Sequence, residues 1–180
     1  PDLELFLYEA QTHQLLEQLE TGRLDCAIVA SVRETEPFIE VSLFKERMLL
    51  AVAENHPWAK EQTIPMSMLK DREMLMLDDG HCLRNQALGY CFTAGAKENS
   101  HFQATSLETL RNMVAANAGM TLMPELAVLS EGERGGVKYL PCQPEPSRDV
   151  ILVYRPGSPL RARYERIAEA IANSVKSILS

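Results

Sequence analysis

Apolar residues along the chain follow two spacings, and these spacings alternate from one segment to the next. Continuous or alternating apolar runs predict strands at residues 3–8, 24–30, 73–78, 120–124 and 149–155. Two further strand-like runs, F-I-E-V and R-M-L-L-A-V-A, lie within residues 38–53. The run at 24–30 is apolar throughout, which is typical of a central parallel strand covered on both faces.

Between these strands, apolar residues spaced three and four apart predict helices. Three of the predicted helices have recognisable starts, at an N-cap Thr12, at a capping box of Thr105 and Glu108, and at Ser158 with Pro159 in the first helical position. Glycines suited to a helix end follow the first two, Gly22 and Gly119. A helix is also predicted at residues 82–91, shortly after the strand at 73–78.

Alternating strands and helices predict an α/β fold. The order of elements fits two Rossmann-like lobes, with the chain crossing between them near residues 44–48 and again near 148–150. We therefore predict that residues 1–45 and 150–180 form the first lobe, and that residues 46–149 form a second lobe inserted into it.

Charge, composition and missing motifs exclude several classes of function. The 180 residues carry a net charge of −7 and a pI of about 5.2, so the chain repels a phosphate backbone and is not expected to bind nucleic acid by itself. No run of 18 apolar residues predicts a membrane span. The first residues lack the pattern of a signal peptide and look like a segment inside a longer, cytoplasmic protein. Neither G-x-S-x-G nor a glycine-rich phosphate loop occurs.

The four cysteines are the main candidates for chemistry. No C-x-x-C pair occurs, so a structural zinc site is not expected. No cofactor is predicted. Cys26 and Cys142 lie in apolar contexts and are interpreted as structural. Cys82 would open a helix, where backbone N–H groups and the helix dipole favour a thiolate, with His81 and Arg84 as neighbours. The alternative is that Cys82 is a small buried hydrophobic residue.

Cys91 follows Cys82 by nine residues. Nine residues of α-helix rise about 13.5 Å and turn about 900°, whereas a disulfide needs Cα atoms within about 7 Å. If the segment is helical, a bond between the two therefore requires it to unwind, and Gly89 lowers that cost. This spacing allows a redox switch. The alternative is that Cys91 packs in a core and never meets Cys82.

Three other residues have two interpretations each. Thr12 and His13 are either a helix cap and a surface residue, or they hydrogen-bond a small polar molecule brought near Cys82. Arg148, at the second crossing, is either an exposed charge or a source of positive charge near the thiol.

Several segments resemble the peroxide-sensing branch of the LysR-type transcriptional regulators, and the likeness covers essentially the whole chain. They are G-H-C-L-R-N-Q-A-L-G-Y-C, A-Q-T-H-Q-L-L, T-S-L-E-T-L-R-N-M-V-A-A and L-V-Y-R-P-G-S-P-L-R-A-R-Y. The cysteine pair is the specific part, since other LysR-type regulators lack it. The resemblance implies a two-lobed effector domain similar to type 2 periplasmic binding proteins, here without the first strand and helix of lobe one.

The resemblance also implies roles for individual residues. Hydrogen peroxide would oxidise Cys82, the peroxidatic cysteine, to a sulfenic acid, and Cys91, the resolving cysteine, would close a disulfide that remodels residues 82–91 and the oligomer interface. Thr12 and His13 match residues that line the peroxide pocket, and His81 and Arg84 match neighbours of the thiol. Arg148 matches, with a gap of one position, an arginine that contacts the thiol in the reduced form. Asn85 departs from the aspartate usual in this branch, so no charge interaction is expected there.

The function implied is that of a redox-sensing regulatory domain of a transcription activator, which is not an enzyme. Its implied partners are hydrogen peroxide, a second copy in a dimer, a tetramer in the parent protein, a reductant of the glutaredoxin or thioredoxin type, RNA polymerase, and promoter DNA through an N-terminal winged helix-turn-helix outside this chain. Two alternatives remain, a LysR-type effector domain or solute-binding protein that responds to a small molecule, and a thiol peroxidase.

Overall fold

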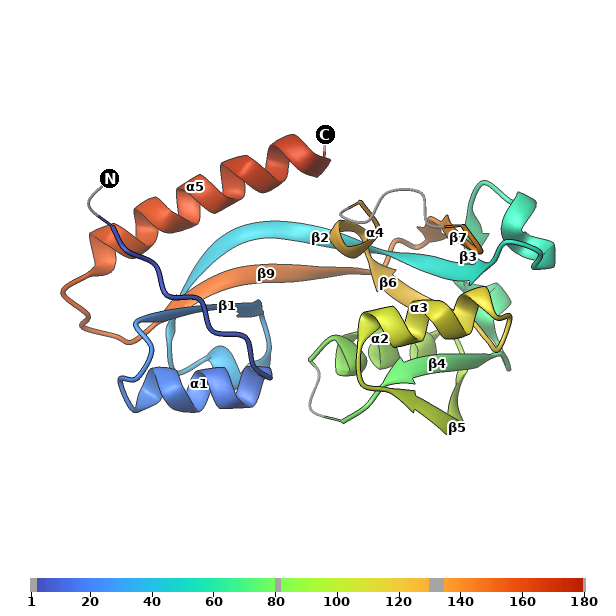
Figure 1. Cartoon of the computed structure of the whole chain (residues 1–180), viewed down its shortest axis with the longest axis horizontal. Helices are drawn as coiled ribbons and strands as arrows, with labels where there is room; N and C mark the ends of the chain where they lie inside the picture. Colours follow the sequence, from blue (N-terminus) through green and yellow to red (C-terminus); the bar gives the residue numbers. More distant parts are fainter. Residues whose placement is uncertain (1–2, 80–81, 130–134, 180) are drawn as a thin grey trace.

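The computed structural model describes residues 3–79, 82–129 and 135–179 and has two α/β lobes joined by long strands (Figure 1). Strand β2 (Ile39–Ala53) runs through both lobes, and β9 (Ser147–Tyr154) returns from the second lobe to the first. The predicted α/β fold with two lobes is confirmed. No helix in the described part of the chain is long and apolar enough to cross a membrane.

The first lobe is a sheet with a helix on each face. Its strands lie in the order β1 (Cys26–Ala30), β9 and the first part of β2, and all of these pairs are antiparallel. Helix α1 (Thr12–Glu20) covers one face and α5 (Arg161–Leu179) covers the other (Figure 1). Alternate strand positions bury apolar side chains under each helix, with Val29, Ile151 and Val153 toward α1 and Leu43, Leu152 and Tyr154 toward α5.

The second lobe has one larger core. The last part of β2 pairs with β6 (Thr121–Pro124) and β7 (Val137–Leu140), while β4 (Glu73–Leu77) lies parallel to β5 (Lys97–Ala104) and β3 (Ile64–Pro65) lies parallel to β8 (Cys142–Gln143). The helices are α2 (Cys82–Thr93), α3 (Leu107–Ala115) and α4 (Glu125–Leu129), with short 3-10 turns η1 (Arg33–Thr35, in the first lobe), η2 (Pro57–Lys60) and η3 (Met66–Leu69). These elements enclose fully buried side chains that include Met48, Leu50, Ile64, Leu69, Met74 and Met123.

Strand β2 changes partners at the crossover between the lobes. Arg47 is still paired with Ser147 of β9, whereas Met48 is paired with Pro124 of β6. The two strand-like runs within residues 38–53 are therefore one continuous strand. The lobe boundaries at 45/46 and 149/150 remain a prediction.

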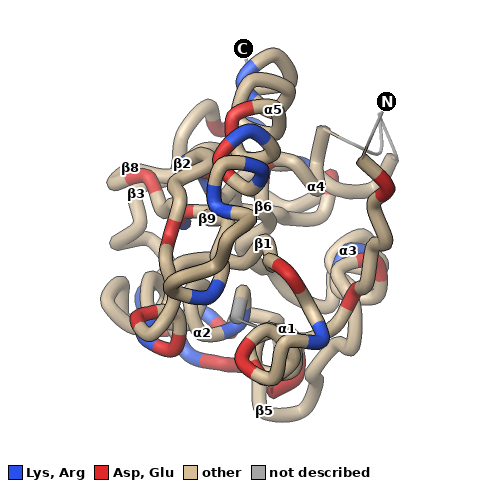
Figure 2. Tube along the Cα trace, turned by 90° about the vertical axis from the view of Figure 1, so that its left-hand side faces the viewer, with Lys and Arg blue, Asp and Glu red and all other residues tan. Residues whose placement is uncertain are grey.

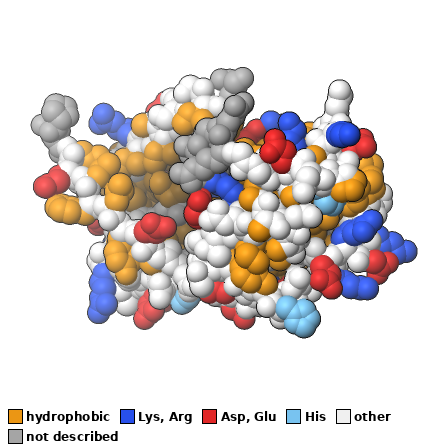
Figure 3. Space-filling model, turned by 45° about the vertical axis from the view of Figure 1, so that its right-hand side comes forward, with side chains coloured by type: hydrophobic (Ala, Val, Ile, Leu, Met, Phe, Trp, Pro, Cys, Tyr) orange, Lys and Arg blue, Asp and Glu red, His pale blue; other side chains and the backbone are white. Residues whose placement is uncertain are grey.

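The predicted strand at residues 3–8 is wrong. These residues have no regular secondary structure, and Leu7 is 94% exposed. Their alternating apolar pattern suits a strand, but a strand also needs a neighbouring strand to take its backbone hydrogen bonds. No described strand pairs with them. Hydrophobic side chains consequently gather at this end of the molecule, on the left of Figure 3.

The interpretation of residues 24–30 as a central parallel strand is also wrong. Only Cys26–Ala30 form a strand, which is antiparallel to β9 and lies at the edge of the described sheet. Ile28 is accordingly exposed on one face. A short apolar run does not distinguish an edge strand beside a helix from a central strand.

Three predicted helix starts are shifted along the chain. Helix α1 has Gln11 at its N-cap, and Thr12 is its first helical residue. Helix α3 is capped by Ser106, whose hydroxyl accepts the N–H of Thr109 at 3.1 Å. Helix α5 begins at Arg161, after a turn in which the hydroxyl of Ser158 accepts the N–H of Leu160. Neighbouring polar residues can each serve as a cap, so sequence alone leaves a choice.

Candidate functional site

Helix α2 contains both cysteines of the G-H-C…C stretch. It begins at Cys82 and runs through Cys91 to Thr93 without interruption, as the sequence predicts. Over this span an α-helix rises about 13.5 Å, and its ends face opposite ways. A disulfide between Cys82 and Cys91 therefore requires α2 to unwind. The side chain of Cys82 and the whole of His81 lie outside the described residues, so their predicted roles stay predictions.

Cys91 is buried in the core of the second lobe. Its side chain is 1% exposed, and Leu83 and Ala87 lie buried on the same face of α2. Cys142 of β8 belongs to the same core and is 2% exposed. Burial, and to a lesser extent a charge on Cys142, raises the pKa of Cys91 to about 12, and burial raises the pKa of Cys142 to about 11. Both thiols are therefore protonated, and poor nucleophiles, at neutral pH.

These raised pKa values predict a loss of stability in alkaline solution. A thiol with a higher pKa in the folded state stabilises the fold fully below its unfolded pKa of about 8.5, and this contribution is lost as pH rises toward the folded value. We expect the unfolding free energy to fall by about 1.4 kcal/mol per pH unit for each thiol in that range. Urea unfolding of the reduced protein from pH 8 to 10.5 measures this effect. A variant with Cys91→Ala and Cys142→Ala should show a much smaller fall, to which Cys26, whose pKa is also raised, still contributes. Equal slopes in both proteins would contradict the assignment.

Arg84 is held by two carboxylates. Its Nε donates to Oδ1 of Asp79 at 3.0 Å, and its Nη2 pairs with Oε1 of Glu98 at 2.8 Å, with the guanidinium buried. The three side chains together carry a net negative charge. Arg84 thus fastens the start of α2 to β5, while its predicted influence on the Cys82 thiol stays a prediction.

Thr12 and His13 begin helix α1. Figure 1 shows that α1 starts on the side of the first lobe that faces the second lobe. His13 is exposed and lines a groove of about 530 Å³ together with Glu17, Glu20, Glu34 and others. Acidic positions are correspondingly frequent around α1 in Figure 2. No described contact joins Thr12 or His13 to Cys82, so their place in a peroxide pocket stays a prediction.

Arg148 lies on β9 directly opposite Glu46 on β2. Its Nε donates to Oε2 of Glu46 at 2.7 Å, and Oε1 of Glu46 accepts the N–H of Leu126 at 2.9 Å. Glu46 is 0% exposed. This arrangement fastens both crossover strands to α4, and the predicted contact of Arg148 with the thiol stays a prediction.

Tyr90 is a functional candidate that sequence reasoning missed. Its hydroxyl donates to the carbonyl oxygen of Ser147 at 2.8 Å, which joins α2 to the first residue of β9. Beside this bond, α2 borders a groove of about 610 Å³ that is also lined by Met66, Ser67 and Pro144. The partner is a backbone carbonyl, and a sequence pattern gives no signal for such a contact.

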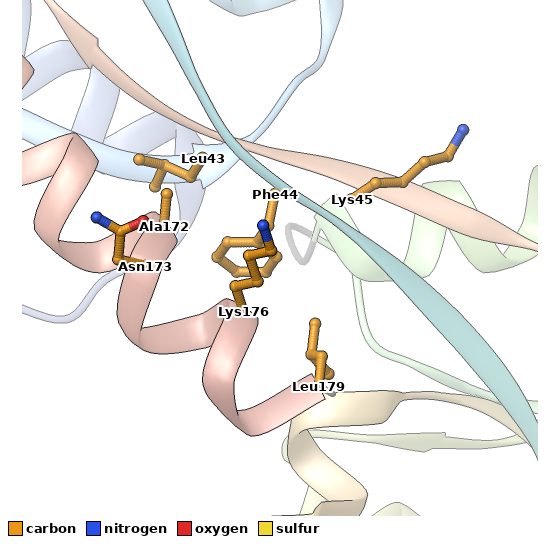
Figure 4. A pocket seen from close by; sticks show the side chains of 7 residues that line it. All are labelled: Leu43, Phe44, Lys45, Ala172, Asn173, Lys176 and Leu179. Atoms are coloured by element: carbon orange, nitrogen blue, oxygen red, sulfur yellow. The ribbon is translucent and has the colours of Figure 1, made fainter.

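A further cavity lies away from the residues predicted from the sequence. The cavity in Figure 4, of about 390 Å³, lies between α5 and β2, where Lys176 stands beside Phe44 and Lys45 points away. It contains none of the residues predicted from the sequence. Among the described side chains, no three His, Cys, Asp or Glu residues are placed to bind a metal ion.

The comparisons with known proteins agree with this arrangement. The profile of the LysR substrate binding domain matches residues 1–176. A relative from Haemophilus influenzae, described as a hydrogen peroxide-inducible genes activator, is 79% identical over 180 residues, which is 99% of this chain and 60% of the relative. The chain thus spans less than two thirds of that relative.

Two solved structures have the same fold. The crystal structure of the oxidized form of OxyR is 63% identical, with a TM-score of 0.86. The crystal structure of the reduced form of OxyR is 59% identical, with a TM-score of 0.88. Each match covers 96% of this chain and 82% of the other. The chain therefore belongs to the LysR substrate-binding domain family and, within it, to the OxyR group.

Proposed function

We propose that this chain is the redox-sensing regulatory domain of a LysR-type transcription activator that responds to hydrogen peroxide. The description of the Haemophilus influenzae relative and the oxidized and reduced OxyR structures support this proposal. The observation that carries it is helix α2, which holds Cys82 and Cys91 at distant positions on one helix. A bond between them changes the backbone, and such a change can report oxidation to the rest of the protein.

The first step takes place at Cys82. Its thiolate sulfur attacks one oxygen of hydrogen peroxide, the O–O bond breaks as the S–O bond forms, and hydroxide leaves and is protonated to water. The position at the start of α2 favours the thiolate. By contrast, the pKa values of Cys26, Cys91 and Cys142 are all raised, mainly by burial. This difference supports the choice of Cys82 as the thiol that reacts.

The second step joins the two cysteines. The sulfur of Cys91, losing its proton, attacks the sulfur of the Cys82 sulfenic acid, and the hydroxyl group leaves as water when the S–S bond forms. Cys91 must first leave the core, because its thiol is buried and protonated in the helical form. Unwinding of α2 therefore both brings the sulfurs together and activates Cys91.

The proposal assigns the surroundings of Cys82 to peroxide binding and thiolate stabilisation. The residues assigned to these roles are Thr12, His13, His81, Arg84 and Arg148. Among them, Arg84 is fastened to Asp79 and Glu98, and Arg148 to Glu46, so each already has a carboxylate partner.

The proposed domain reacts once per reduction cycle and is a sensor without turnover. A thiol reductant of the glutaredoxin or thioredoxin type would reset it. In the parent protein, which we place in the cytoplasm, the domain would form dimers within a tetramer. That protein would bind promoter DNA through an N-terminal winged helix-turn-helix and act on RNA polymerase.

Peroxide titration with alkylation of free thiols and peptide mapping tests the proposal. We expect one equivalent of peroxide to yield a Cys82–Cys91 disulfide, with sulfenic acid on Cys82 before it. Absence of that bond contradicts the proposal. Repeated turnover with a reductant favours a thiol peroxidase, and a melting temperature raised by a small metabolite, with no response to peroxide, favours a metabolite-responsive domain.

Replacing Gly89 by alanine is expected to slow the second step. A Cβ at Gly89 meets no atom within 4 Å, so alanine fits the helical form. Alanine inside a helix is more stable than glycine by about 1 kcal/mol, so we expect disulfide closure about fivefold slower. Loss of free thiols in time after a peroxide pulse measures this rate.

A matched control for that variant is Gly135→Ala. A Cβ at Gly135 also meets nothing within 4 Å, and the residue lies outside α2. It should leave closure unchanged. Equal slowing by both substitutions, or none by Gly89→Ala, would show that the stability of α2 does not limit closure.

A further inference from the structure

We infer that Tyr90 is a positioning residue for the second step, whose hydrogen bond to Ser147 holds the Cys91 end of α2 and breaks before Cys91 reaches Cys82. This inference rests on the proposed function, since it concerns the closure of the Cys82–Cys91 disulfide. In this role Tyr90 contacts neither the peroxide nor the reacting sulfur atoms. It acts by holding Cys91, its neighbour in the chain, in position.

The bond joins α2 to the strand that crosses between the lobes. The hydroxyl of Tyr90 donates to the carbonyl of Ser147 at 2.8 Å, although the two residues are 57 positions apart. Ser147 is the first residue of β9 and pairs with Arg47, where β2 changes partners. The next residue, Arg148, is fixed to the buried Glu46. Tyr90 is therefore bound to a part of the chain that β2 and Glu46 hold in place.

The two ends of α2 are fastened differently. At the start, Arg84 is buried and bonded to both Asp79 and Glu98. Near the other end Gly89 weakens the helix, and the rings of Tyr90 and Phe92 are exposed. This end is held by the packing of Leu88, Cys91 and Ala94 and by the Tyr90 hydrogen bond, and no ion pair is described there. The Cys91 end is therefore the one expected to move.

The required movement is too large for the bond to survive. The Cα atoms of Cys82 and Cys91 must approach from about 13.5 Å in the helix to within about 7 Å. If the start of α2 stays fastened, Cys91 moves by at least about 6 Å, and Tyr90, its direct neighbour, moves with it. A hydrogen bond is lost when its atoms separate by much more than about 3.5 Å.

Replacing Tyr90 by phenylalanine tests the inference in the intact protein. A single hydrogen bond of this kind accounts for about a two- to tenfold change in an equilibrium, so we expect closure to become about two- to tenfold faster. The reduction potential of the disulfide should become more negative by up to about 30 mV, which corresponds to tenfold. Formation of sulfenic acid on Cys82, followed with a trapping dione, should keep its rate, because Tyr90 does not act in the first step.

Thr93→Val is the matched control. It removes a hydroxyl from the same helix, but that hydroxyl donates to the carbonyl of Gly89 within α2 at 2.8 Å and not to β9. It should leave the closure rate unchanged. An equal acceleration by Thr93→Val would assign the effect to general weakening of α2 and overturn the role of Tyr90.

The outcomes distinguish a failure of the Tyr90 role from a failure of the proposed function. If the unchanged protein closes the disulfide and Tyr90→Phe closes it at the same rate, the role of Tyr90 is wrong and the proposed function stands. If the unchanged protein forms no Cys82–Cys91 bond, both are wrong. Faster sulfenic acid formation in Tyr90→Phe also overturns the inference, because it places Tyr90 in the first step.

Discussion

Replacing Cys82 by serine is expected to remove the response to peroxide, although three other cysteines remain. With a pKa of about 12, Cys91 is a thiolate in about one molecule in 10⁵ at pH 7, whereas an ordinary cysteine is a thiolate in about 3% of molecules. Because the thiolate is the species that reacts, we expect oxidation at Cys91 to be about a thousandfold slower or more, and Cys26, whose pKa burial also raises, to react more slowly than an ordinary cysteine. Peroxide consumption in the first minutes of reaction, together with peptide mapping, measures this.

Cys91→Ser separates the two steps in the same assay. It should react with peroxide as fast as the unchanged protein, but the reaction should stop at a sulfenic acid on Cys82. Helix α2 should then remain folded, since no bond draws its ends together. If Cys82→Ser consumes peroxide at the original rate, another cysteine is the reacting thiol, which would contradict the proposed mechanism.

The central feature of the site could be predicted from local sequence alone. A helix over residues 82–91 follows from the composition of the segment, and the separation of its two cysteines follows from the geometry of any α-helix. The structure confirms that helix. The spacing of the two cysteines does not reveal the environment of each thiol. Cys91 is buried in a core that it shares with β8 and other elements distant in sequence.

Contacts between distant segments explain most of what was missed. The role of Arg84 beside Cys82 stays a prediction, whereas its ion pair with Glu98 had no signal in the sequence, because β5 is a polar strand that the apolar pattern does not indicate. Strand prediction also failed at residues 3–8, where the pattern was correct but no described strand pairs with it. The local sequence indicates whether a segment favours a strand conformation. Whether it forms a strand also depends on a neighbouring strand that pairs with it.

The partner of Arg148 did have a signal in the sequence. In a strand, alternate residues share a face, so Glu46 lies on the same face as Met48, Leu50 and Val52. All four are fully buried. A carboxylate at the end of such a row needs a cation or N–H donors, and an arginine near the second crossing was the available candidate.

Replacing Glu46 by alanine is expected to destabilise the domain strongly. The change leaves Arg148, whose side chain is only 21% exposed, without its carboxylate and leaves the N–H of Leu126 without its acceptor. Breaking a buried ion pair costs about 3–5 kcal/mol, and we expect a value near 3 because Arg148 retains some contact with water. Urea unfolding of the reduced protein at pH 7 measures this loss.

Two further variants decide whether the ion pair causes that loss. Glu46→Gln keeps an acceptor for Leu126 and should lose less stability than Glu46→Ala. The double change Glu46→Leu with Arg148→Met removes both charges together and should be more stable than Glu46→Ala, because no buried charge is left alone. If the double variant is as unstable as the sum of its single changes, the packing volume of Glu46 and not its charge holds the crossover strands to α4.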